Sequence, residues 1–361
     1  MKLLLEIPLN NLSFGNVSYN LVRELYKREA EIGIFPIGEK VDLNAFDVPQ
    51  ELVKYIQTAI DRRWEFLHSE IPSLKLWHLN GSENRKNPNQ TLLTFYECND
   101  PTEVEFKICE VQNNTIFSST HAQDQFKFRG ARNTHYVPMG FDEDFFETKK
   151  TYLHDTVHFG LMGKFEKRKH TQKIIQTWLK KYGNDSKYQI SCCVNNPFFK
   201  PEQMKALIDS TLEGRNYNNI NFIPHLEKNK EVNEFLNSIN IDLTGLSGGE
   251  GWNLPAFNST CLGKWSVVLK CTSHKDWANE DNSIQVTPSG QMPAADGVFF
   301  NKGGNFNQGS FKTWDEEEAI SAMEKAESKV GQINTEGQKL ADKFTYSNTL
   351  QQILDCINSP K

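Results

Sequence analysis

The sequence lacks a long apolar run, spaced cysteine or histidine pairs, and an excess of basic residues. No stretch approaches the roughly 18 apolar residues that a membrane-spanning helix needs. The N-terminal run from Met1 to Leu9 is interrupted by Glu6, so we interpret it as a first strand and not as a secretion signal. The 7 cysteines include no Cys-x-x-Cys spacing, so neither a disulfide framework nor a zinc site is expected. These absences favour a cytoplasmic protein with reduced cysteines, and a peripheral position at a membrane stays open.

Composition and length describe a globular chain with room for two cores. Hydrophobic residues make up 38% and charged residues 24% of the 361 positions, and two domains of roughly 150 to 180 residues each are the natural expectation. The formal net charge of −6 argues against a general nucleic-acid-binding protein, because neutralising phosphates needs a concentrated basic face. The net charge is still compatible with a basic cleft on one part of the surface.

The most informative stretch runs from Ile239 to Thr260 and combines a short strand, a glycine turn and a helix start. Apolar residues alternate up to Leu243, and Leu254-Pro255 opens the helix, with proline near the first turn where its missing donor costs nothing. Backbone N–H groups at such a helix start bind anions, which suits a sugar diphosphate. An ordinary turn with a solvated Glu250 is the alternative. The candidate donor-binding residues of this turn are Gly249, Gly251, Trp252, Asn253 and Leu254.

Two segments carry a resemblance to a known family. Residues 249–255, Gly-Glu-Gly-Trp-Asn-Leu-Pro, resemble the Glu-Gly-Phe-Gly-Leu-Pro element of the retaining, nucleotide-sugar-dependent glycosyltransferases with the GT-B fold. Residues 115–146 are similar to another signature of that family: Ser118-Ser119 ends a strand, Gly130 ends a helix, and Pro138-Met139-Gly140-Phe141-Asp142 follows the next strand.

The resemblance implies an α/β chain of two Rossmann-like, parallel-sheet domains facing a cleft. Residues 1–150 would form the acceptor-side domain and residues 151–342 the nucleotide-sugar-binding domain. The final segment, 343–361, resembles the closing helix that packs back on the first domain of these enzymes.

A basic cluster follows the strand expected at Val157 to Met162. Four cationic side chains fall between positions 164 and 169, and a solvated charge run is the alternative interpretation. The family has Gly-Arg here and a lysine five residues after that arginine, and both contact the diphosphate. Lys164 and Lys169 stand at these positions, and Arg168 is the candidate for a bidentate contact because Lys replaces Arg at 164. The resemblance makes Lys164, Arg168, Lys169 and Glu250 the catalytic set, with Glu250 holding hydroxyls of the donor sugar.

Three further positions are assigned to the donor. Gly15 and Asn16 match a glycine-containing loop that faces the donor phosphates across the cleft in the family, although a structural turn explains them equally well. Asn258 stands where the family has a second glutamate that accepts hydrogen bonds from the ribose. Its amide oxygen can still accept one, so an altered nucleotide preference is expected.

Acceptor-side candidates follow other predicted strands of the first domain. His78 ends the strand expected at Lys75 to Leu79, Glu97 ends the strand expected at Thr91 to Glu97, and His121 follows Ser118-Ser119. Ligands gather at the carboxyl ends of strands in open α/β sheets, although a lone polar residue there is often only solvated.

The function implied by the resemblance is transfer of a hexose or pentose from a nucleotide diphosphate sugar to a glycan, lipid-linked or other hydroxyl acceptor, with retention of configuration. Neither a metal nor a cofactor is expected, because the cationic cluster and a helix N-terminus can neutralise a diphosphate. Two alternatives stay open: a glycosyltransferase for hydroxymethylated pyrimidines in DNA, and a degenerate, non-catalytic sugar-nucleotide-binding subunit. The residues available for DNA are Lys127, Arg129, Arg132 and His135.

Overall fold

The computed structural model describes residues 2–38, 40–148, 150, 152–153 and 155–359, and the chain divides into two compact units. Unit 1 comprises Met1–Asp142, Phe300–Gly309 and Phe344–Lys361, and unit 2 comprises Glu143–Phe299 and Ser310–Lys343. The sequence analysis placed the divisions after residues 150 and 342. It did not anticipate that a ten-residue segment, 300–309, belongs to unit 1.

Unit 1 is built on a six-stranded parallel sheet with the strand order β2-β1-β3-β4-β5-β6. Its strands are β1 (Lys2–Ile7), β2 (Glu31–Pro36), β3 (Ser73–Leu76), β4 (Gln90–Thr94), β5 (Asn114–Phe117) and β6 (Thr134–Tyr136). Its helices are α1 (Ser13–Lys27), α2 (Gln50–Asp61), the short 3-10 helix η1 (Arg63–Phe66), α3 (Glu103–Val111), α4 (Thr120–Phe128) and α12 (Tyr346–Asn358).

Strands β3, β4 and β5 are buried at every position rather than at alternate ones, because helices cover both faces of a parallel sheet. Leu3, Leu4 and Leu5 of β1 are at most 1% exposed, and Leu4 pairs with Gly33 of β2. Helix α1 contributes Leu21, Val22 and Leu25 to the buried core, at helical spacing.

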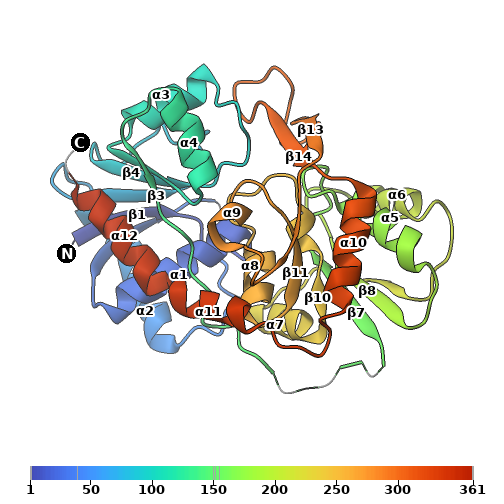
Figure 1. Ribbon diagram of the computed structural model, residues 1–361. Helices are drawn as coiled ribbons and strands as arrows, with labels where there is room; N and C mark the ends of the chain where they lie inside the picture. The colour runs from blue at the N-terminus through green and yellow to red at the C-terminus, as the bar shows by residue number, and fades with distance from the viewer. Residues whose placement is uncertain (1, 39, 149, 151, 154, 360–361) are drawn as a thin grey trace. The chain divides into compact units, whose positions relative to one another are not determined.

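Helix α12 returns the C-terminal segment to unit 1, where it lies beside α1 (Figure 1). The Arg28 guanidinium donates to Ser347 O at 2.9 Å, and Asn114 Nδ2 donates to Cys356 O at 2.8 Å. Segment 300–309 is also tied to unit 1, because Asn307 N donates to Glu105 Oε1 at 2.8 Å and Thr102 Oγ1 donates to Asn305 O at 2.6 Å.

Unit 2 contains a second six-stranded parallel sheet, with the order β12-β11-β10-β7-β8-β9, and a two-stranded antiparallel hairpin. Its strands are β7 (Val157–Met162), β8 (Tyr188–Cys193), β9 (Ile220–Phe222), β10 (Ile241–Asp242), β11 (Trp265–Leu269), β12 (Ile284–Val286), β13 (Gly290–Pro293) and β14 (Ser310–Thr313). Its helices are α5 (Thr171–Tyr182), α6 (Pro201–Thr211), α7 (Asn229–Ser238), the 3-10 helix η2 (Thr244–Leu246), α8 (Leu254–Cys261), α9 (His274–Trp277), α10 (Glu316–Glu327) and α11 (Thr335–Lys343). One continuous core joins β7, α5 and α10 through Phe159, Trp178 and Met323.

Several predicted elements end earlier than the pattern indicated. The apolar spacing of residues 49–68 predicts one helix, but α2 stops at Asp61, because the 3-10 turn that follows brings Phe66 into the core beside Leu4. Strands β3 and β4 end at Leu76 and Thr94, so His78 and Glu97 lie in the loops that follow these strands.

Candidate active site

The candidate site of unit 2 lies at the point in its sheet where the order of strand addition reverses. From β7 the chain builds β8 and β9 on one side, and it then returns to build β10, β11 and β12 on the other. The loops after β7 and β10 therefore diverge from neighbouring strand ends, which is where open α/β sheets bind ligands. The first loop carries the predicted basic cluster and the second carries the glycine turn.

Five charged side chains from these two loops form one array. Lys164 Nζ lies 2.9 Å from Glu166 Oε1, and Arg168 Nη2 lies 3.1 Å from Glu166 Oε2. Arg168 Nη1 lies 3.0 Å from Glu250 Oε2, and Lys169 Nζ lies 2.6 Å from Glu250 Oε1. Cations and carboxylates alternate, so three positive and two negative groups leave a net charge of +1.

The array is buried at its centre and open at one end. The side chains of Glu166, Arg168 and Glu250 are 4%, 7% and 7% exposed, whereas Lys164 is 36% exposed. Burial alone would raise the pKa of Glu250, but Arg168 and Lys169 outweigh it and hold the pKa well below its usual range. Burial would also raise the pKa of Glu166, but Arg168, Lys169 and Lys164 outweigh it and lower the pKa. Both carboxylates are therefore ionised at neutral pH.

The two predicted lysines are held in different ways. Gly163 has φ +138, which favours glycine, and the stem of Lys169 packs directly against it. A side chain at 163 would meet Lys169 Cδ at 3.2 Å. Lys164 Nζ lies 4.8 Å and 5.3 Å from the ring centroids of Phe299 and Phe198, within cation–π range.

Arg168 is placed as a structural link between the two loops. Its guanidinium donates to Gly249 O as well as to both carboxylates. Its backbone O accepts from Gly248 N at 2.9 Å. A Cβ at Gly248 would lie 2.2 Å from Lys312 O, so this glycine is required for close packing of the backbone.

The start of α8 is fixed by buried polar contacts. Asn253 is the N-cap with φ 66, and its Nδ2 donates to Thr244 O at 3.1 Å and to His274 Nε2 at 2.9 Å. Because His274 Nδ1 lies 2.9 Å from Leu269 O, Nδ1 must carry the proton and Nε2 is the acceptor. Burial lowers the pKa of His274, which keeps the ring neutral.

The remaining predicted residues of the turn lie around this helix start. Trp252 is 1% exposed, and its ring packs 5.3 Å from that of Phe257. Leu254 is the first residue of α8. Asn258 lies one turn further and is 6% exposed, and its Oδ1 has no hydrogen-bond partner among the described residues.

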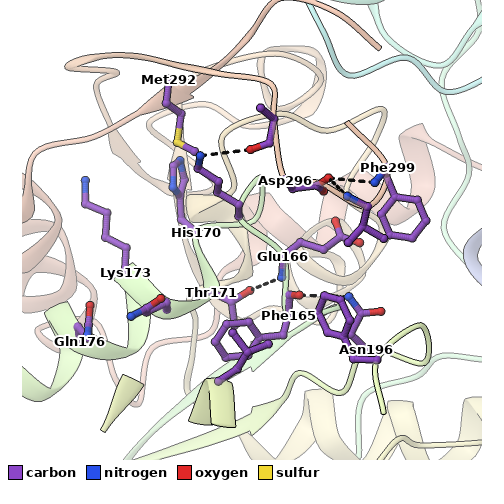
Figure 2. A pocket seen from close by; sticks show the side chains of 16 residues that line it. Phe165, Glu166, His170, Thr171, Lys173, Gln176, Asn196, Met292, Asp296 and Phe299 are labelled. Carbon is purple, nitrogen blue, oxygen red and sulfur yellow. Dashed lines mark hydrogen bonds between the residues drawn. The ribbon is translucent and has the colours of Figure 1, made fainter. Parts of the chain in front are cut away.

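A pocket of about 540 Å³ borders the array (Figure 2). Its walls come from the loop after β7, from α5 and α6, and from the segment after β13. Glu166 lines it, so the carboxylate that holds Lys164 and Arg168 also borders this space. Asp296 accepts from the backbone N–H groups of Val298 and Phe299 at its rim.

The predicted residues of the first domain are placed in unit 1. Gly15 and Asn16 lie in the first turn of α1 and not in the loop before it. His78, Glu97 and His121 follow β3, β4 and β5, three neighbouring parallel strands, so all three belong to the same edge of the sheet.

The sequence analysis missed two residues that shape the site. Glu166 stands inside the basic run, and this single acidic residue between lysines was the available signal. His274 gave no local signal, because its role depends on meeting Asn253 from a separate loop.

Asp142-Glu143-Asp144 has the Asp-x-Asp spacing found in many cation sites. Asp142 accepts from Asn20 Nδ2 at 3.1 Å and lies 3.3 Å from Arg23 Nη2, whereas Asp144 accepts from Asn229 Nδ2 at 3.2 Å. Within the described residues, no three His, Cys, Asp or Glu side chains are grouped so that they could hold a metal ion. The described helices include none with the length and apolar character to cross a bilayer.

Neither a family model nor a curated protein matches the chain by sequence. Solved structures do match it. Sucrose-phosphate synthase from Thermosynechococcus elongatus shares 12% identity, with 98% of each chain covered and a TM-score of 0.70. OtsA shares 11% identity, with 100% of this chain and 99% of that chain covered and a TM-score of 0.67. HepE of Anabaena, solved with UDP and glucose, shares 14% identity, with 98% of each chain covered and a TM-score of 0.65.

At these identities the likeness shows the fold. The neighbours are GT-B glycosyltransferases, and this chain has the GT-B fold with two α/β units, each built on a parallel sheet. The fold class predicted from the sequence is confirmed.

Proposed function

We propose that this chain transfers a hexose or pentose from a nucleoside diphosphate sugar to an acceptor hydroxyl, with retention of anomeric configuration. The observation that carries the proposal is the charged array at the switch point of unit 2, beside the start of α8. Lysines and a helix N-terminus brought to one sheet edge suit a diphosphate, and buried carboxylates beside them suit sugar hydroxyls.

The donor diphosphate binds Lys164 and Lys169 in this proposal. The net charge of +1 on the array favours an anion, and the dipole of α8 adds to it. Lys164 is the more exposed of the two lysines and meets the ligand first. The backbone N–H groups of Gly251 and Trp252 are the expected partners at the helix start.

The other predicted residues orient the donor. Glu250 accepts hydrogen bonds from sugar hydroxyls, because each carboxylate oxygen has capacity beyond its one cationic partner. Arg168 is a positioning residue in this proposal, because its two terminal nitrogens already bind Glu166, Glu250 and Gly249 O. Asn258, whose Oδ1 has no partner among the described residues, faces the ribose.

Catalysis consists mainly of stabilising the departing diphosphate. The bond between the anomeric carbon and the phosphate oxygen breaks, and the acceptor oxygen forms a bond to that carbon from the same face. The acceptor proton passes to the leaving phosphate oxygen, so no protein base is assigned. The two lysines supply the neutralising charge, and no metal or cofactor is part of the proposal.

The comparisons support this proposal. One neighbour, HepE, has been solved with UDP, with UDP-glucose, and with UDP and glucose. A nucleoside diphosphate and a hexose are therefore ligands of a protein with this fold. A glycan, lipid-linked or other hydroxyl compound is the acceptor class that we propose, in the cytoplasm or at a membrane surface.

The test separates sugar recognition from nucleotide recognition. A panel of UDP- and GDP-sugars is assayed for donor hydrolysis in water, with and without EDTA, and UDP and GDP are titrated calorimetrically. We expect Glu250→Gln, which keeps shape but loses charge, to slow hydrolysis about a hundredfold while weakening nucleotide binding far less. Activity is expected to survive chelation, because Lys164 and Lys169 supply the charge.

The matched control is Glu202→Gln, an exposed glutamate in the first turn of α6. This variant should change neither the rate of donor hydrolysis nor the affinity for UDP and GDP. The assignment of Glu250 to the sugar hydroxyls is wrong if Glu250→Gln weakens nucleotide binding as much as it slows hydrolysis. Loss of all activity in EDTA would overturn the metal-independent mechanism.

A further inference from the structure

The sheet of unit 1 has a switch point of its own, between β1 and β3. From β1 the chain first builds β2 on one side, and it then places β3, β4, β5 and β6 on the other. The segments after β1 and β3 therefore diverge from adjacent strand ends, and open α/β sheets bind ligands at such a position. In unit 2 the equivalent position holds the charged array.

In unit 1 this position holds aromatic rings. Phe14 lies in the first turn of α1, Trp77 and His78 directly follow β3, and Phe95 directly follows β4. The ring of Phe14 lies 5.9 Å from Trp77, 4.6 Å from His78 and 5.1 Å from Phe95, measured between centroids. Three segments that are far apart in the sequence thus contribute to one ring cluster.

The ring cluster is not part of the buried core. Phe14, Trp77 and Phe95 are partly exposed and His78 is exposed, whereas the stacked core pair Phe117 and Phe126 is fully buried. The indole N–H of Trp77 makes no hydrogen bond within the part of the chain that the structure describes. The cluster therefore offers apolar ring faces and a hydrogen-bond donor to solvent.

A buried lysine of β3 fixes the loop that carries Trp77 and His78. Lys75 Nζ lies 2.5 Å from Glu6 Oε1, and it also donates to Gly81 O at 2.9 Å and Asn84 O at 3.0 Å. Ser82 Oγ donates to His78 O at 2.6 Å. These bonds hold the loop after β3 against the sheet, so Trp77 and His78 are positioned before any ligand arrives.

The charge at the cluster excludes some ligands. Among the described residues no lysine or arginine lies over the rings of Phe14, Trp77 or Phe95, and Lys75 of β3 is paired with Glu6. A phosphate-bearing chain such as nucleic acid draws most of its affinity from cations. The cluster instead matches a neutral ring that has an apolar face and hydroxyls at its edge.

We propose that Phe14, Trp77 and Phe95 form the binding site for a neutral pyranose ring, the terminal sugar of the acceptor. This inference rests on the proposed transfer function, and it names the acceptor class. The ring packs its C–H face on Trp77 and Phe95, and one of its hydroxyls accepts from Trp77 Nε1. The acceptor is therefore a glycan and not DNA.

The site is tested by saturation-transfer NMR on the full chain without any donor. The probes are the methyl pyranosides of glucose, galactose, mannose and N-acetylglucosamine, with thymidine and a short oligothymidylate as competitors. We expect at least one methyl pyranoside to bind, and Trp77→Ala and Phe95→Ala to weaken it about tenfold or more. Trp77→Phe keeps a ring face but loses the indole donor, so its affinity should lie between those of the parent and Trp77→Ala.

Trp64→Ala is the matched control, because Trp64 is 62% exposed and lies outside the cluster. It should leave glycoside binding unchanged, and a thermal unfolding scan of each variant checks folding. The proposal is overturned if no glycoside binds the parent chain, if Trp77→Ala binds as well as the parent, or if the oligothymidylate alone binds through these rings. UDP and GDP titrations on the same preparation test the proposed transfer function separately. Glycoside binding without any nucleotide binding would refute the donor site and leave the ring site intact.

Discussion

Lys169 is held at two points within the charged array. Its stem packs on Gly163, and its ammonium lies 2.6 Å from Glu250. A lysine held in this way is oriented before the substrate binds, so little of its side-chain entropy is lost in the reaction. Lys164, by contrast, is flanked by two rings and reaches solvent.

We predict that Lys169→Ala lowers turnover by two to three orders of magnitude, about the effect of losing one charge-assisted contact in the transition state. The measurement is the turnover number at saturating donor. Lys167→Ala is the matched control, since Lys167 lies in the same loop, is exposed, and donates to Ala295 O at 3.2 Å outside the charged array. Equal turnover in Lys169→Ala and the parent would remove Lys169 from the mechanism.

Helix α5 begins at a histidine that burial keeps neutral. His170 is the N-cap with φ 55 and is 5% exposed, and its Nε2 donates to Lys312 O at 2.8 Å. Burial, with a smaller effect of nearby Lys173, lowers its pKa to about 4 from an ordinary value of 6.5. The unfolded chain therefore binds a proton between these two values that the folded chain does not.

This difference predicts that acid weakens the fold. The contribution of His170 is fully present above pH 6.5 and is lost progressively as the pH falls toward 4, because only the unfolded state takes up the proton. Between pH 7 and pH 5 we expect His170→Gln to lose about 2 kcal/mol less unfolding free energy than the parent. Urea titrations at both pH values measure the difference. Equal losses in both proteins would contradict a buried neutral His170.

At the scale of the whole molecule, unit 1 depends on residues from the end of the chain. Helix α12 buries Leu350, Ile353 and Ile357 in unit 1, and Thr349 Oγ1 donates to Pro138 O at 2.8 Å. The charged array and the start of α8, in contrast, belong to unit 2. A destabilising substitution in α12 should therefore lower the stability of unit 1 more than that of unit 2.

We predict that Ile353→Ala destabilises unit 1 by about 3 kcal/mol, the usual result of emptying a fully buried aliphatic site. Calorimetry with UDP identifies the unit 2 transition as the one that the nucleotide raises. In Ile353→Ala, only the transition that UDP does not raise should shift to a lower temperature. Gln352→Ala, on the exposed face of α12, is the control. A matching drop in the nucleotide-protected transition would mean that the two units do not unfold separately.

The sequence determined what depends on neighbours along the chain. Short apolar runs such as Leu3-Leu4-Leu5 predict buried parallel strands, and the glycine turn before Leu254-Pro255 predicts a helix start at an anion site. The resemblance of two local segments, 115–146 and 249–255, to the glycosyltransferase family was enough to predict the GT-B fold. Lys164, Lys169 and Glu250 were identified in the same way, because each belongs to a local motif.

Only the tertiary structure decided what depends on residues distant in sequence. Arg168 lies between Glu166 and Glu250, which are more than 80 positions apart, so only the folded chain shows that its guanidinium links the two loops. The ring cluster of Phe14, Trp77 and Phe95 forms because three strand ends meet at one sheet edge. Strand pairing is non-local, so spacing along the chain cannot show which loops it brings together.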